Sequence, residues 1–135
     1  MEQERFEELV RRGLERVPEA IAGHMNNLDV EVHDQPTAAQ LTSAGVPAGH
    51  TLLGLYVGIP LTRRTSGYNL VPPDRIIIFK TPLERLSRND DDLVDRVTDT
   101  VIHEVAHHFG ISDERLQEIE ADRRRQHKRP AANDR

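Results

Sequence analysis

Two histidines and a glutamate in this chain stand at a spacing that suits metal-assisted hydrolysis. His103 and His107 are four positions apart, and Glu104 directly follows the first of them. A helix turns about 100° per residue, so the two imidazoles would project from one side and could share one ion. Glu104 would lie beside that pair, where its carboxylate can reach a water molecule without binding the metal. The segment therefore predicts a metal site with Glu104 as the catalytic base.

The residues after the second histidine extend the pattern to HExxHxxGxxD. Gly110 permits the positive φ that ends a helix and turns the chain. Asp113 then offers a hard oxygen ligand. With His103 and His107, it would bind one zinc ion per chain and leave the fourth position open for water. These donor types also suit cobalt, nickel or iron.

The third ligand has alternatives. Either Ser112 or Asp113 could simply cap the helix that follows. Glu118 or Glu120 on that helix could then supply the carboxylate instead. Of these carboxylates, Asp113 is preferred.

The two sides of the predicted metal helix differ in character. Measured from His103 on a helical wheel, Thr100, Glu104 and His107 fall within about 100° on the same side. His108 falls near 140°, among the apolar residues, and is expected to pack or to accept a hydrogen bond rather than to bind metal. The apolar residues of the far side are Val94, Val97, Val101, Ile102, Val105 and Phe109.

Length and composition indicate a small single domain. The chain has 135 residues, which predicts one core over residues 1–128 and a flexible tail over 129–135. It has no cysteine, no apolar start typical of a signal peptide and no apolar run of the ~20 residues that span a bilayer. We therefore expect a cytoplasmic protein with no membrane partner. The net charge of −5 argues against nucleic acid as a partner, and the basic run 123–129 is expected to be a solvated helix end.

The order of predicted elements is α+β. A helix is expected over 2–22, where Pro18 either kinks it or starts a second helix. Strands are expected over 28–33, 52–59 and 75–80, the last in a central position because its apolar run is continuous. The glycines in 52–59 predict a bulge or a close backbone approach. The other predictions are a helical turn over 37–42, an exposed loop over Pro60–Pro73, a short helix over 83–88, the metal helix from 89 or 90 to 109, and a last helix over 113–127.

Three further segments accompany the metal motif: GLYVGIPLT at 54–62, PDRI at 73–76 and KTPLE at 80–84. Together they resemble a family of small, single-domain bacterial zincin-like metallopeptidases, over roughly residues 5 to 125. The resemblance implies an α+β fold in which a mixed sheet of about three to four strands packs against the N-terminal helix and the metal helix. It also implies that His103, His107 and Asp113 bind the metal and that Glu104 is the base.

The motif is also similar to that of metzincin proteases with an aspartate as third ligand. Those enzymes place a methionine beneath the metal after that ligand, whereas Met1 and Met25 are the methionines of this chain. Few residues follow Asp113, so the far wall of a substrate cleft would be missing or would come from a protein partner.

The residues favour a zinc-dependent metallopeptidase that hydrolyses a peptide or protein substrate. The alternative is a non-catalytic zinc-binding domain that binds a partner, and a packing helix without metal is a third reading. Glu104 favours the enzyme, because a purely structural site needs no base beside its first ligand. Tyr68 and Tyr56 are candidate oxyanion donors. A substrate backbone would pair most naturally with a strand edge near Leu53–Val57.

Overall fold

The computed structural model describes residues 1–58 and 73–133, with side chains described as far as residue 125. The loop predicted over Pro60–Pro73, which contains Tyr68, lies outside the described residues except for Pro73 itself. The elements follow one another as α1 (Gln3–Glu15), α2 (Glu19–Ala22), β1 (Leu28–His33), α3 (Ala38–Ser43), β2 (Gly54–Val57), β3 (Asp74–Phe79), α5 (Lys80–Leu86), α6 (Asp90–His108) and α7 (Asp113–Asn133).

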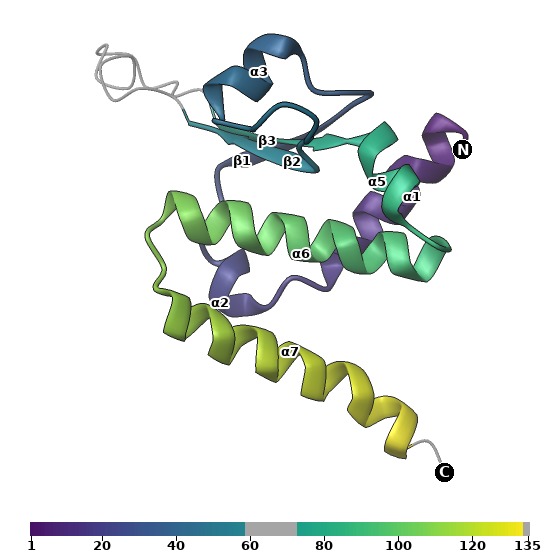
Figure 1. The fold of residues 1–135 in the computed structure, drawn as a ribbon. Helices are drawn as coiled ribbons and strands as arrows, with labels where there is room; N and C mark the ends of the chain where they lie inside the picture. The colour runs from purple at the N-terminus through teal and green to yellow at the C-terminus, as the bar shows by residue number, and fades with distance from the viewer. Residues whose placement is uncertain (59–72, 134–135) are drawn as a thin grey trace.

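Within the described residues, three strands form one mixed sheet in the spatial order β1-β3-β2 (Figure 1). β1 runs parallel to β3, with Leu28 opposite Asp74. β2 runs antiparallel to β3, with Gly54 opposite Ile78, and forms an edge of the sheet. The α+β class, the small mixed sheet and the central position of the third strand are thus confirmed.

Both faces of β3 are buried, which explains its unbroken apolar run. Side chains alternate along a strand, so Ile76 and Ile78 point to one face and Ile77 and Phe79 to the other. Ile76 and Ile78 join the main core, which α6 covers from below in Figure 1. The segment that contains α3 covers the opposite face (Figure 1). Helices and connecting segments therefore exclude water from both sides of the central strand.

The main core lies where α6 packs between the sheet and α1. The apolar stripe of α1 meets the buried side of α6. The wheel predicts this burial correctly except at Phe109, which is 43% exposed. Pro18 does not kink one long helix but precedes α2 as its N-cap residue. The fully buried residues at this junction are Phe6, Leu9, Val94, Val97, Val101 and Ile102.

α7 begins at Asp113 as expected, and its backbone continues to Asn133, beyond the end predicted at His127. Residues 129–133 of the predicted tail therefore belong to this helix, in keeping with the strong helix propensity of Ala131 and Ala132. Ile119 is the buried apolar residue that attaches α7 to the core. None of the helices in the described part of the chain is long and apolar enough to cross a membrane.

The crossing of α1 and α6 requires a glycine on α1. A Cβ added at Gly13 would lie 2.8 Å from Val97 Cγ1 and 3.0 Å from the Val94 carbonyl oxygen. The buried Thr98 on α6 also joins the two helices, because its hydroxyl donates a 2.8 Å hydrogen bond to the Gly13 carbonyl oxygen. The two helices therefore approach more closely here than a side chain on residue 13 would allow.

We predict that Gly13→Ala destabilises the fold by about 1–3 kcal/mol, although alanine is the better helix former, because the added methyl group overpacks the helix crossing. Urea unfolding at equilibrium measures the change. Gly23→Ala is the matched control, since Gly23 has a φ of −60° and its nearest neighbour to an added Cβ lies at 3.4 Å. Equal stability of the two variants would contradict this account of the crossing.

Candidate metal centre

The helix that carries the metal motif is defined at both ends. The Asn89 side chain accepts a hydrogen bond of 2.8 Å from the Asp92 backbone and caps the N-terminus. At the other end, Gly110 has a φ of 68°. The Ile111 N–H donates to the Ala106 carbonyl at 2.9 Å, the bond that closes a Schellman turn. The predicted role of Gly110 is confirmed, and the motif histidines lie in the last two turns of α6.

The ring of His103 is oriented by the helix itself. Its Nδ1 lies 2.7 Å from the Asp99 carbonyl oxygen, one turn earlier. A carbonyl can only accept, so Nδ1 carries a proton. In the neutral ring this leaves a lone pair on Nε2, the arrangement in which metal-binding histidines are usually held. With its side chain 53% exposed, His103 can be reached from solvent.

The Glu120 carboxylate of α7 faces the same nitrogen. Its Oε2 lies 3.6 Å from His103 Nε2. When the ring is neutral, this geometry sets a lone pair against a carboxylate oxygen, and a cation or a second ring proton is needed to make the contact favourable. The structure thus brings one of the two alternative carboxylates of α7 to the first histidine. The other, Glu118, pairs instead with Arg115 at 3.0 Å.

Glu104 lies half-buried between α6 and the edge strand. Its Oε1 accepts a hydrogen bond of 2.9 Å from the backbone N–H of Tyr56 on β2. Burial raises the pKa of Glu104 above its ordinary value, and the Tyr56 N–H, His107 and His103 oppose that rise. The Tyr56 backbone therefore orients the Glu104 carboxylate, which also interacts electrostatically with His103 and His107.

The Tyr56 N–H belongs to the open edge of the sheet. In an antiparallel pair, alternate residues bond to the partner strand, and the Phe79 N–H donates to the Leu53 carbonyl at 3.0 Å. Residues 55 and 57 therefore also direct their backbone N–H and C=O groups toward β3. Residues 54 and 56 direct theirs away from β3, toward the free edge of the sheet. Glu104 therefore accepts a hydrogen bond from the strand edge near Leu53–Val57, where a substrate backbone is expected to pair.

His107 and Asp113 are both exposed, the first near the end of α6 and the second at the start of α7. Ser112 supplies the cap of α7, because its Oγ accepts a 3.1 Å hydrogen bond from the Arg115 N–H. Asp113 is thus not needed as a cap. In the part of the chain with described side chains, no three His, Asp or Glu residues converge on a common metal position. The two-histidine face is present, but the third ligand is not brought to it.

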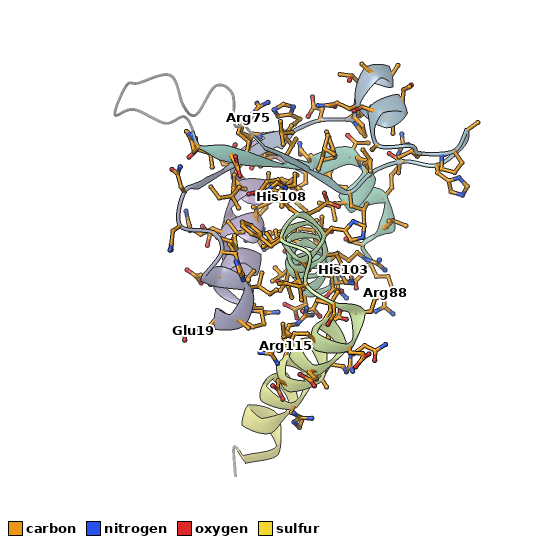
Figure 2. The ribbon with its side chains drawn as sticks, turned by 90° about the vertical axis from the view of Figure 1, so that its left-hand side faces the viewer. Glu19, Arg75, Arg88, His103, His108 and Arg115 are labelled. Carbon is orange, nitrogen blue, oxygen red and sulfur yellow. The ribbon has the colours of Figure 1, made fainter. Side chains whose placement is uncertain are left out.

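His108 packs on the sheet side of α6, whereas His103 lies on the side of α7 (Figure 2). The His108 ring stacks on Tyr56 with ring centroids 3.9 Å apart, and His108 Nε2 lies 3.8 Å from Asp74 Oδ2. This position agrees with its predicted packing role. The Tyr56 hydroxyl donates to Asp74 at 2.6 Å, so its use as an oxyanion donor would require that bond to break. Tyr68 lies outside the described residues.

A cleft of about 390 Å³ opens on the metal face of α6. One wall is the segment 51–54 that leads into β2, and the other is the exposed side of α6 from Arg96 to Glu104. The residues that line it are Thr51, Leu52, Leu53, Gly54, Arg96, Asp99, Thr100, His103 and Glu104. His103 and Glu104 stand at one end, so a molecule in this cleft would reach the candidate catalytic groups.

Sequence reasoning missed three parts of this site: the Tyr56 N–H, the Asp99 carbonyl and the Arg96 end of the cleft. The Asp99 carbonyl could have been found, since it lies four residues before His103 on the predicted helix. The Tyr56 contact depends on how β2 lies against α6, and no local pattern encodes it. The predicted close approach at the strand glycines is confirmed at Gly54, where a Cβ would lie 2.5 Å from Thr100 Cγ2 and 3.2 Å from the Ile77 carbonyl oxygen.

A helix bearing HExxH beneath a small mixed sheet is the arrangement expected of a zincin-like metallopeptidase. The chain matches the zincin-like metallopeptidase family over residues 25–123, and it belongs to that family. Its fold is similar to that of a conserved hypothetical protein from Thermus thermophilus, with a TM-score of 0.50 and 21% identity over 81% of this chain and 94% of the other. No curated protein matches the chain.

We predict that Gly54→Ala loosens the contact between β2 and α6, because the added methyl group overlaps the Thr100 methyl. The expected result is a loss of about 1–3 kcal/mol in stability and faster hydrogen exchange at the Tyr56 amide. Adding Thr100→Ser should restore part of both, since serine lacks the methyl group and keeps the hydroxyl that donates to the Arg96 carbonyl at 2.7 Å. A double variant no better than Gly54→Ala would show that Thr100 is not the obstacle.

Proposed function

We propose that this protein is a zinc-dependent peptidase in which Glu104 is the general base. The observation that carries the proposal is the pairing of Glu104 with the Tyr56 backbone, next to His103, whose Nδ1 is bound to the Asp99 carbonyl oxygen. A structural metal site gains nothing from a carboxylate placed there, whereas hydrolysis requires one. The net charge of −5 supports a peptide rather than a nucleic acid as the substrate. Absence of cysteine supports action in the cytoplasm.

The donor set on α6 fits zinc. His103 and His107 project from consecutive turns, and the Asp99 carbonyl keeps the His103 Nε2 lone pair available. Asp113 is the third ligand by its place in the family motif. Glu120 is the competing choice, because its carboxylate already lies beside His103. When bound, zinc would lower the pKa of a water molecule toward about 7 and polarise a carbonyl group.

Glu104 would move the proton. Its carboxylate takes a proton from the attacking water and then delivers it to the leaving amine, so that the peptide bond breaks as a carboxylate and an amine form. The Tyr56 N–H binds one carboxylate oxygen of Glu104, and the second oxygen would take the proton. Half-burial raises the pKa of Glu104, which makes it a stronger base than an exposed carboxylate.

We predict that Glu104→Gln keeps zinc and lowers the rate of peptide hydrolysis by about 10²-fold or more. Glutamine can still accept a hydrogen bond from the Tyr56 N–H, but it cannot take a proton from water. Elemental mass spectrometry measures the zinc, and a mixed peptide library read by mass spectrometry measures hydrolysis. His103→Ala should lose both. Hydrolysis at the wild-type rate in the Glu104→Gln protein would sink the proposal, and a zinc-loaded wild type that cleaves nothing would favour a non-catalytic zinc-binding domain.

The third ligand is decided by comparing two variants that change one atom each. We predict that Asp113→Asn lowers zinc affinity by 10-fold or more, on the order of what a ligand or its support contributes, and that Glu120→Gln has a smaller effect. Zinc titration against a competing chelator gives both affinities. Glu118→Gln is the control, because its partner is Arg115. The reverse order of Asp113→Asn and Glu120→Gln would assign the ligand to α7 beside His103.

A further inference from the structure

We propose that the cleft beside the candidate base selects peptides that carry a carboxylate group two or three residues from the cleaved bond, and that Arg96 binds this carboxylate. The inference rests on the proposed peptidase function and adds a substrate class to it. The carboxylate could be an acidic side chain or the free C-terminus of the peptide. Both present the same planar pair of oxygens to a guanidinium group.

The position of Arg96 carries the first part of the argument. It lines the 390 Å³ cleft at the opposite end from His103 and Glu104. Its side chain is 36% exposed, so it is open to a ligand and yet partly screened from water. Thr100 lies midway and is tied to the helix through its own hydroxyl. The cleft thus joins the candidate catalytic pair to a single guanidinium group.

Among the described residues, Arg96 is paired through its Nε alone. Its Nε donates to Asp92 at 3.2 Å, but Arg88 lies against the same carboxylate, with its Nε at 3.7 Å. The Arg88 backbone N–H and Arg96 hold the pKa of Asp92 below its ordinary value, so the carboxylate stays ionised. Two guanidinium groups therefore share one negative charge. The terminal nitrogens of Arg96 have no partner among the described residues and remain able to grip a carboxylate.

The other acid at this end of the cleft does not cancel that charge. Asp99 also lines the cleft, and its carboxylate is bound by Arg123 of α7. Asp99 is therefore already paired with a cation of α7. Arg96 is the guanidinium group among the residues that line the cleft, and its terminal nitrogens are left for a ligand.

The spacing along α6 sets where the carboxylate must lie in the substrate. Arg96 and His103 are seven positions apart, which corresponds to about 10 Å along a helix axis. An extended peptide advances about 3.3 Å per residue. A substrate whose reacting carbonyl lies near His103 and Glu104 would therefore reach Arg96 with a group two or three residues away.

Matched peptides test the proposal. A set of eight-residue peptides would carry Glu or Gln at each position in turn, each with a free or an amidated C-terminus. We expect Arg96→Gln to lower kcat/KM by about 10- to 100-fold for the preferred carboxylate peptides and to leave their neutral counterparts unchanged. Loss of the preference on amidation assigns it to the C-terminus, and loss on exchange of Glu for Gln assigns it to a side chain. Wild-type protein that shows no carboxylate preference would overturn the inference while leaving peptidase activity established.

Arg88→Gln is the matched control. It removes the same charge from the same Asp92 partner, but Arg88 is 82% exposed and lies outside the cleft. The preference should survive in this variant, and equal losses in Arg88→Gln and Arg96→Gln would overturn a specific role for Arg96. Binding of the same peptides to the zinc-loaded Glu104→Gln protein, measured by calorimetry, separates this inference from catalysis. A carboxylate preference in binding that Arg96→Gln removes supports the inference even when nothing is cleaved. Equal binding of the Glu and Gln peptides, together with equal binding of the free and amidated peptides, refutes it.

Discussion

The close packing of α6 against the edge strand is the constraint on which the rest of this structure depends. At Gly54 the strand comes so near the helix that a Cβ would meet the Thr100 methyl group at 2.5 Å. That approach lets the Tyr56 N–H reach the Glu104 carboxylate at 2.9 Å. About two turns before Glu104, α1 packs closely against the buried side of the same helix at Gly13. Glycines on two different elements therefore fix the position of one helix, and that helix carries the candidate site.

Helix α6 serves the core and the site at once because its two sides are chemically different. Its buried side holds valines and isoleucine at about 0% exposure, which anchors the helix through the hydrophobic effect. Its other side is left with Arg96, His103, Glu104 and His107. Because the backbone of a packed helix cannot shift freely, the spacing between these polar groups is preserved without further support. A site on such a helix is preorganised in a way that a loop would not allow.

Electrostatics divide the open side of α6 into two parts. Around Glu104, burial makes the charged carboxylate less favourable, and the backbone of β2 and the two histidines compensate. Around Arg96, two guanidinium groups contact the single carboxylate of Asp92. α7 connects these regions, since Glu120 faces His103 and Arg123 binds Asp99. The last helix thus contributes charges to a site whose motif lies on another element.

Local patterns in the sequence determined the elements and much of the site. The apolar periodicity of α6, the continuous run of β3 and the turn at Gly110 all follow from side-chain chemistry within a few residues. HExxH placed both histidines and Glu104 on one side of a helix for the same reason. Tertiary structure alone decided that Tyr56 orients Glu104, that Glu120 rather than Glu118 faces His103, and that Arg96 ends the cleft. These contacts join residues far apart in the chain, and they depend on how elements pack, which periodicity within one element does not encode.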